Sequence, residues 1–254
     1  MTSNLYDNQF FESQKSGSYS SARKIVPILV DKINPQSVVD VGCGVGTWLR
    51  AFSEAGVTDV TGVDGDYVNQ SQLQIPVRSF IPHDLATAIP RNRRFDLAMS
   101  LEVAEHLDKS HAVRFVDDLC ALADIVFFSA AIPYQSGIGH VNEQWQSYWA
   151  RIFADRGYAA FDVVRPRVWN CEDVALWYRQ NSLIFANLDG LKRCPGIADN
   201  QPLVSVVHPA AYTTHADAAT TDLRRIGVAR ILKSLPLLFW NSFYGRIRSL
   251  LGKK

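Results

Sequence analysis

Short apolar runs alternate with segments of helical spacing along the first half of the chain. Runs rich in β-branched and aromatic residues predict strands at 37–41, 57–63, 77–81, 95–100 and 125–129. Segments in which apolar residues recur every three or four positions predict helices at 47–52 and 111–123. Strands that alternate with helices join through right-handed crossovers into a parallel sheet. The pattern therefore predicts an α/β fold, with a doubly wound sheet and helices on both of its faces.

The second half of the chain extends this pattern. A helix at 143–153 and strands at 158–164 and 183–186 make the expected sheet seven-stranded and mostly parallel. Ser20 and Ser21 are candidate caps of a helix that ends near Ile33. The expected organisation is an N-terminal helical segment at 1–36, a single domain at 37–188, a linker or weakly ordered segment at 189–222 and a tail at 223–254.

Composition places the chain among globular proteins. Of its 254 residues, 47% are hydrophobic and 20% are charged. No apolar run approaches the ~18 residues that cross a bilayer, and no secretory signal is visible at the start. The four cysteines are widely spaced and form no CxxC pair: Cys43, Cys120, Cys171 and Cys194. We therefore expect a cytoplasmic protein with reduced thiols and neither disulfides nor a structural zinc site.

The net charge of +1 hides an asymmetry. Residues 223–254 carry eight Lys or Arg and no acid, which leaves −7 on residues 1–222. An acidic body argues against an enzyme that grips nucleic-acid phosphates over its whole face. The basic, amphipathic tail fits an anionic membrane surface, or docking on the chain's own body or on a second subunit in a homodimer.

A glycine-rich loop follows the first predicted strand. Gly42, Gly44 and Gly46 separate that strand from the helix that begins at Thr47. Glycines allow a sharp turn and a close approach of ligand to backbone, and the helix N-terminus offers free N–H groups. Nicotinamide-binding loops read GxGxxG, whereas this loop reads GxGxG. The spacing therefore favours a ligand whose tail carries no phosphate.

Residues 38–47 resemble the first motif of the class I S-adenosylmethionine-dependent methyltransferases, and the resemblance extends over about residues 36–133. It implies a Rossmann-like methyltransferase sheet whose glycine loop holds the methionine moiety. It also implies that Asp64 binds the ribose hydroxyls and Asp84 the adenine amine. The cofactor-binding residues that it implies are Asp40, Gly42, Cys43, Gly44, Gly46, Asp64, Asp84, Leu85 and Leu101.

An ExxEH cluster follows the fourth predicted strand. On a helix, Glu102, Glu105 and His106 share one face. Such a set binds a divalent metal or performs acid–base chemistry. It is similar to a cluster of the small-RNA 2′-O-methyltransferases and the ubiquinone-biosynthesis O-methyltransferases, where ExxEH and a second His hold magnesium; His140 is the candidate here. Two alternatives follow: these four residues bind Mg²⁺ or another divalent ion, or no metal is used and His106 or His140 is the catalytic base.

The segment between Pro133 and Arg179 is rich in aromatic and amide side chains, which stack on flat rings and supply directed hydrogen bonds. Trp149 and Phe153 have the spacing of core residues. The candidate substrate residues are Asn142, Glu143, Trp145, Tyr148 and Arg179. Residues 142–149 resemble a segment of methyltransferases from bacterial polysaccharide and secondary-metabolite pathways, which favours a sugar-like acceptor.

Together these features predict methyl transfer from S-adenosylmethionine to a hydroxyl of a small polar acceptor, such as a sugar or a glycan or secondary-metabolite intermediate. Methylation of an amine or a carboxylate is the alternative within the enzyme class. A non-catalytic S-adenosylmethionine-binding scaffold subunit is the alternative outside it. No specific nucleic-acid partner is expected.

Overall fold

The computed structural model describes residues 8–198, 204–214 and 216. The chain divides into two units, Met1–His208 and Pro209–Lys254. Residues 209–214 are helical in the second unit, and the predicted basic tail at 223–254 lies outside the described residues. The sheet and the helices that cover it belong to the first unit.

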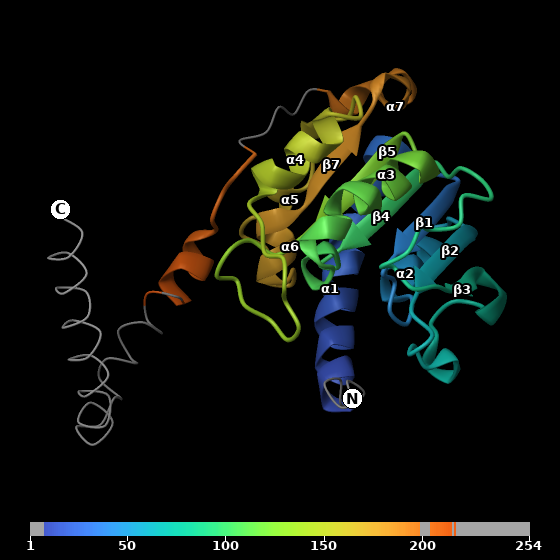
Figure 1. Cartoon of the computed structure of the whole chain (residues 1–254), viewed down its shortest axis with the longest axis horizontal. Coiled ribbons are helices and arrows are strands. Elements are labelled where there is room, and N and C mark those ends of the chain that lie inside the picture. The colour runs from blue at the N-terminus through green and yellow to red at the C-terminus, as the bar shows by residue number, and fades with distance from the viewer. Residues whose placement is uncertain (1–7, 199–203, 215, 217–254) are drawn as a thin grey trace, which may run out of the picture. The chain divides into compact units, whose positions relative to one another are not determined.

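A seven-stranded sheet with the order β3-β2-β1-β4-β5-β7-β6 forms the centre of this unit (Figure 1). The strands are β1 (Ser37–Val41), β2 (Asp59–Asp64), β3 (Phe80–Pro82), β4 (Leu97–Leu101), β5 (Ile125–Ser129), β6 (Ala159–Phe161) and β7 (Leu183–Ala186). β1 to β5 pair in parallel, whereas β7 pairs antiparallel with both β5 and β6. The predicted seven-stranded, mostly parallel sheet is confirmed.

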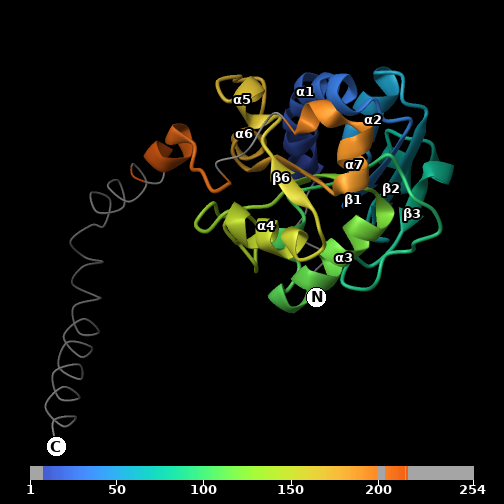
Figure 2. The same ribbon diagram turned by 90° about the horizontal axis from the view of Figure 1, so that it is seen from above.

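Helices cover both faces of the sheet because neighbouring strand residues point to opposite sides. Val38 belongs to one buried apolar cluster and Val39 to the other. Figure 2 shows α1 and α2 on one face and α3 and α4 on the other. The helices are α1 (Asn8–Ile33), α2 (Thr47–Glu54), α3 (Ala112–Leu122), α4 (Gln146–Ala154), α5 (Arg165–Val168), α6 (Leu176–Asn181) and α7 (Leu188–Arg193).

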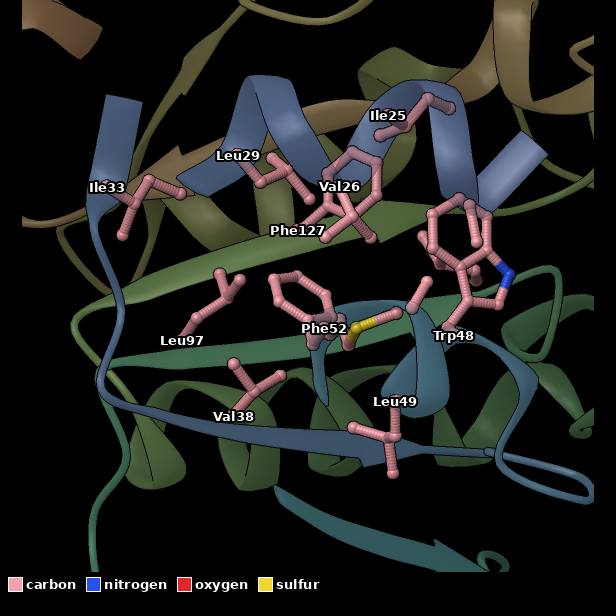
Figure 3. Close-up of a cluster of buried hydrophobic side chains, with 14 of the residues drawn as sticks. Ile25, Val26, Leu29, Ile33, Val38, Trp48, Leu49, Phe52, Leu97 and Phe127 are labelled. Atoms are coloured by element: carbon pink, nitrogen blue, oxygen red, sulfur yellow. The ribbon is translucent and has the colours of Figure 1, made fainter. Parts of the chain in front are cut away.

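The N-terminal helix begins earlier than predicted. We expected it to start at Ser20–Ser21, but α1 starts at Asn8. Ser21 is not a cap: its hydroxyl donates to the Gly17 carbonyl one turn earlier (2.7 Å) and accepts from the Ala175 N–H (2.9 Å). Apolar side chains of α1, including Ile25 and Leu29, pack on the sheet residues and α2 (Figure 3). The N-terminal helix is therefore part of the same core as the sheet.

Two predicted strands are shorter than expected because other structure replaces their ends. Residues 77–79 form a 3₁₀ turn after Pro76, so β3 begins only at Phe80. The predicted strand at 158–164 ends at Phe161 as β6. Beyond it the chain turns into α5, where the guanidinium of Arg165 pairs with the carboxylate of Asp162 at 2.8 Å.

The predicted linker at 189–222 is wrong in its first part. Residues 188–193 form α7, and Pro195–Ile197 form a 3₁₀ turn. Cys194 and Ile197 are buried in the core beside α1, which explains why this segment is ordered. Among the described residues, no helix has both the length and the apolar character needed to cross a bilayer.

Candidate functional site

Two adjoining cavities lie where the parallel strands end. The larger, of about 510 Å³, is bordered by the residues that follow β1, β2 and β3. The smaller, of about 280 Å³, is bordered by residues of the glycine loop, of the turn after β4, of the connection between β5 and α4, and of α6. Both cavities are lined by Gly42, Gly44, Val45, Glu102 and His106. A ligand that spans them therefore passes directly along the glycine loop.

The glycine loop needs glycine for two measurable reasons. Gly42 has φ +87°, and a Cβ added to it would lie 2.3 Å from a methyl of Val103. Gly46 has φ +82°, and its missing Cβ leaves room for Ile75 at about 3 Å. These left-handed conformations let the chain reverse between β1 and α2. Gly46 lines neither cavity, so its role is in the turn itself.

Asp64 lies at the end of β2 with its carboxylate in the larger cavity. One oxygen accepts the Gly44 N–H (2.6 Å), and the other accepts the Gly65 N–H (2.7 Å) and the Tyr67 hydroxyl (2.5 Å). Tyr67 is 70% exposed, so this last donor can leave without repacking the core. Asp84 and Leu85 line the same cavity.

Asp40 is a second buried carboxyl near the loop and lines the smaller cavity. Burial, with a smaller contribution from Asp64, raises the pKa of Asp40 well above its usual range. Cys43 and Leu101 line the same cavity.

We had placed the ExxEH cluster on a helix, and this prediction is wrong for an α-helix. The Glu102 N–H still bonds to the Ser129 carbonyl of β5 (3.0 Å), and Glu102 then adopts φ +55°. Only Ala104–His106 form a 3₁₀ turn. Because hydrogen bonding to β5 continues for one residue beyond β4, to the Glu102 N–H, before the chain reverses, helical spacing does not apply to this segment.

Three of the four predicted metal ligands nevertheless converge. One potential ligand atom from each of Glu105, His106 and His140 lies within 4.8 Å of the others. The His106 and His140 rings meet edge to face, with centroids 4.9 Å apart. Glu102 lies outside this group. Its carboxylate instead accepts from the amides of Gln135 (2.8 Å) and Asn181 (3.3 Å).

His140 is held by a carboxylate from its own loop. Its Nδ1 lies 2.9 Å from one oxygen of Glu143, whose other oxygen accepts the Tyr134 N–H (2.8 Å). The N–H groups of Val141 and Asn142 both donate to the Glu105 main-chain carbonyl, at 2.9 and 3.0 Å. The loop that carries His140 is thus tied to the turn that carries Glu105.

The cluster's electrostatics follow from burial. Within the described part of the chain, neither carboxylate oxygen of Glu105 has a hydrogen-bond partner. Burial and the neighbouring Glu102 raise the pKa of Glu105 well above its usual range. Burial and His140 lower the pKa of His106. An unpartnered buried carboxylate beside two imidazoles, one of them oriented by a further carboxylate, is a donor set that fits a divalent cation.

Comparison with known proteins identifies the family. The sequence profile of a methyltransferase domain matches residues 14–180. The chain belongs to the class I S-adenosylmethionine-dependent methyltransferases. S-adenosylmethionine is its cofactor. The larger cavity is called the cofactor cavity and the smaller one the acceptor chamber, after the roles that we propose for them.

Individual relatives of this methyltransferase are distant. A malonyl-[acyl-carrier protein] O-methyltransferase of Pseudescherichia vulneris is 25% identical over 181 residues, covering 66% of this chain and 70% of the relative. The S-adenosylmethionine-bound magnesium protoporphyrin IX methyltransferase of Synechocystis PCC 6803 is 21% identical, with a TM-score of 0.52 over 72% of this chain and 88% of that one. An O-methyltransferase family protein of Burkholderia thailandensis is 12% identical, with a TM-score of 0.54 over 72% and 60%. The two structures show the shared fold.

None of the five predicted substrate residues, all of them in the described part of the methyltransferase, lines the acceptor chamber or the cofactor cavity. Glu143 orients His140, and buried Asn142 accepts from Gln144 at 3.0 Å. Trp145 is 44% exposed, and Arg179 donates to the Trp169 carbonyl at 3.4 Å. Tyr148 packs edge-on against Trp149. The predicted core role of Trp149 agrees with its burial.

Other side chains of the methyltransferase occupy the places that we had assigned to these five. The acceptor chamber is lined by Gln135, Trp48, Trp177 and Tyr178, and the cofactor cavity by Tyr67. Trp177 and Tyr178 fall in the aromatic segment singled out from the sequence. Gln135 lies in the same segment but was not named as a candidate, whereas Tyr67 carried no such signal because it is a single aromatic residue in a turn.

Proposed function

We propose that this methyltransferase transfers the methyl group of S-adenosylmethionine to a hydroxyl of a small polar acceptor, such as a sugar or a glycan or secondary-metabolite intermediate. The observation that supports it is the placement of Glu105, His106 and His140 beside the junction of the two cavities. Groups that remove a proton or activate a hydroxyl are needed at that point.

The methyl group of a sulfonium is already activated, so the protein mainly aligns acceptor, methyl carbon and sulfur and excludes water. The cofactor lies along Gly42 and Gly44, with its ribose on Asp64 in the cofactor cavity. Its methionine end reaches into the acceptor chamber, beside the predicted cofactor residues Asp40, Cys43 and Leu101. The acceptor enters through the acceptor chamber, and its hydroxyl lies near His106. Buried side chains around the chamber, such as Trp48 and Tyr178, keep that region dry.

The proton of the acceptor hydroxyl leaves as the new C–O bond forms. His106 is suited to accept it, because its lowered pKa keeps the ring neutral near pH 7. His140 is the second candidate. Glu143 engages its Nδ1, which leaves Nε2 available to the chamber.

Metal assistance is the second version of the same chemistry. A divalent cation supplies a Lewis acid that lowers the pKa of the acceptor hydroxyl. Glu105, His106 and His140 would hold it, and Glu143 would orient His140. Glu102, the fourth ligand in our prediction, is engaged by Gln135 and Asn181, so it would have to release these bonds to join the set.

The Pseudescherichia relative is named as an O-methyltransferase, which supports an oxygen acceptor here. That name further raises methylation of a carboxylate, the alternative within the enzyme class.

Activity with and without chelator decides between the two versions. Formation of S-adenosylhomocysteine is measured with an acceptor panel, for the wild type, His106→Ala and His140→Ala. His111→Ala is the matched control, because His111 lines neither cavity. Loss of activity on chelation and recovery with added divalent ion support the metal version. Full activity after chelation, together with a large loss in one histidine variant, supports the general base.

Two outcomes would contradict the proposed roles. If both histidine variants keep near-normal rates, neither version holds, and alignment alone remains. If the protein binds S-adenosylmethionine tightly but forms no S-adenosylhomocysteine with any acceptor, the scaffold alternative replaces the enzyme.

A further inference from the structure

A series of buried amide side chains connects residues 204–208 with the wall of the acceptor chamber. Residues 204–208, which we call the C-terminal strap, are the last residues of the first unit. The His208 N–H donates to Oε1 of Gln180 (2.8 Å), and Nε2 of Gln180 donates to Oδ1 of Asn181 (3.1 Å). Gln180 and Asn181 end α6 and are only 1% and 2% exposed. The hydrogen bonds therefore lead from the strap into the interior.

From α6 the hydrogen bonds continue to the chamber. Nδ2 of Asn181 donates to Oε1 of Gln135 (2.9 Å) and to Oε1 of Glu102 (3.3 Å). Nε2 of Gln135 donates to the other oxygen of Glu102 (2.8 Å). Gln135 and Glu102 line the acceptor chamber, whereas Gln180 and Asn181 line neither of the two cavities. These four side chains, which we call the polar relay, join α6 to the connection between β5 and α4 (Figure 1).

The direction of the hydrogen bonds in the polar relay is determined at its ends. A main-chain N–H can only donate, so the amide oxygen of Gln180 faces His208 and its NH₂ group faces Asn181. Oε1 of Gln135 likewise accepts the Ile132 N–H (3.4 Å), which leaves its NH₂ group for the carboxyl group at the far end. Both ends therefore require the same orientation. No amide of the relay can turn over without placing donor against donor or oxygen against oxygen.

Polar side chains of α4 and α5 hold the strap in place. Arg165, which is 1% exposed, donates to the Val204 carbonyl at 3.1 Å. Gln146, which is 4% exposed, donates to the Val206 carbonyl at 2.9 Å. These bonds offset the cost of burying both side chains. The strap thus presents the His208 N–H to the relay at a defined place.

We propose that Gln180 is a positioning residue for methyl transfer. Its amide, oriented by the strap, holds Asn181 and through it the two residues of the chamber wall, Gln135 and Glu102. The relay thereby keeps the connection between β5 and α4 docked over the chamber. Hydrogen bonds whose direction is determined at both ends, and which reach two residues of the chamber wall, are the observation that carries this proposal. It goes beyond the proposed function and does not depend on which acceptor is methylated.

The test measures amide hydrogen exchange by NMR on the full-length protein saturated with S-adenosylhomocysteine. The reporters are Val141 and Asn142, whose N–H groups hold the connection to the Glu105 carbonyl. Gln180→Met keeps the length of the side chain and removes its polar atoms. Both reporters should then exchange about 10-fold faster or more, because buried partners of the relay are left unpaired and the connection opens more readily.

Gln146→Met is the matched control, because it makes the same change at another buried glutamine that contacts the strap. The Gln146 side chain donates to the main-chain carbonyls of Val206 and Gln180 (2.9 and 3.5 Å), not to the side chains of the relay. Reporter exchange in this variant should stay within about threefold of the wild type. The double variant Gln135→Met/Gln180→Met should exchange no faster than the more affected single variant, because residues that act as one unit are non-additive.

Turnover gives an independent measurement. With any acceptor that yields S-adenosylhomocysteine, Gln180→Met should lower kcat about 10-fold or more, while the KM for S-adenosylmethionine stays within about threefold, because the proposed ribose and adenine residues lie in the other cavity. Gln146→Met should change neither constant. If no acceptor is turned over, the proposed function fails, and the exchange measurements still decide the role of Gln180.

Three results would overturn the proposal. They are unchanged reporter exchange in Gln180→Met, equal acceleration in Gln180→Met and Gln146→Met, and fully additive effects in the double variant. If Gln180→Met does not fold, Gln135→Met at the half-buried end tests the relay in the opposite direction. The His208 amide should then exchange about threefold faster or more, and unchanged exchange of that amide would refute the relay.

Discussion

Replacing Asp64 with Asn tests the cofactor cavity directly. The carboxylate accepts main-chain N–H groups on both oxygens, from Gly44 at 2.6 Å and from Gly65 at 2.7 Å. An amide has only one oxygen, so in either orientation its NH₂ group faces one of these donors. Asp64→Asn is therefore not a conservative change, although it preserves the shape of the side chain.

The magnitude follows from the kind of bond that is lost. A hydrogen bond to a charged group contributes about 1.5–3 kcal/mol, and the variant removes the charge as well as one accepting position for the ribose. We expect S-adenosylmethionine to bind about 2–3 kcal/mol more weakly, which corresponds to about a 30- to 150-fold higher Kd. The effect should be similar for S-adenosylhomocysteine, because the ribose is common to both.

Titration calorimetry with both ligands measures the change. Asp59→Asn is the matched control on the same strand: Asp59 is 45% exposed and pairs with Arg93 at 2.6 Å, away from both cavities. That surface pair is worth about 1 kcal/mol or less, and its loss should leave the Kd unchanged. A Kd for Asp64→Asn within about threefold of the wild type, or an equal loss in the control, would refute the assignment of Asp64 to the ribose.

Three further predictions concern other parts of the site and the core. Burial and Glu102 raise the pKa of Glu105 in the folded protein. The folded state therefore loses stability as the pH rises above the pKa of Glu105 in the unfolded chain, which is about 4. In chelator-treated protein, Glu105→Gln should therefore stabilise the fold by about 1–3 kcal/mol at neutral pH and by little near pH 4, and a thermal-unfolding series without this trend would contradict it. Tyr67→Phe removes a hydroxyl that ribose must displace from Asp64, so calorimetry should show about 3- to 10-fold tighter S-adenosylmethionine binding; weaker binding would mean that the hydroxyl contacts the bound cofactor. Leu29→Ala should lower the free energy of unfolding by about 2–5 kcal/mol in denaturant titrations, because Leu29 is fully buried. Lys24→Ala, at an exposed position of the same helix, should lower it by about 1 kcal/mol or less. Equal effects of the two variants would contradict a core role for α1.

The fold was predictable because local patterns determine most of it. Apolar runs located β1 and β5 to the residue, and the alternation of strands with helices predicted the parallel order. The start of α1 was not predictable, because residues 8–19 lack a clear apolar period. The regular structure of residues 188–197 was not predicted for a related reason. Cys194 and Ile197 pack in the same core cluster as the residues of α1, more than 150 residues earlier in the chain.

The candidate site was predictable where it follows from strand ends. Gly42, Asp64 and Asp84 each follow or end a parallel strand, and all three line the cofactor cavity. The acceptor side was not predictable in the same way. Gln135 and Trp177 line one chamber although 42 residues separate them in sequence, and only the antiparallel return of β7 brings α6 beside the connection that leaves β5.

Two hydrogen bonds from neighbouring amides to one carbonyl determine how the site can open. Val141 and Asn142 both donate to the Glu105 carbonyl, so the His140 loop cannot swing away without breaking both bonds. Local unfolding of this segment should therefore be cooperative, with the two amides showing the same opening free energy in hydrogen–deuterium exchange. It would also remove His140 from His106 and Glu105 in the same event, so a partly open molecule would have no assembled cluster at all. The groups that we propose for catalysis would then come together only when the connection between β5 and α4 is fully docked.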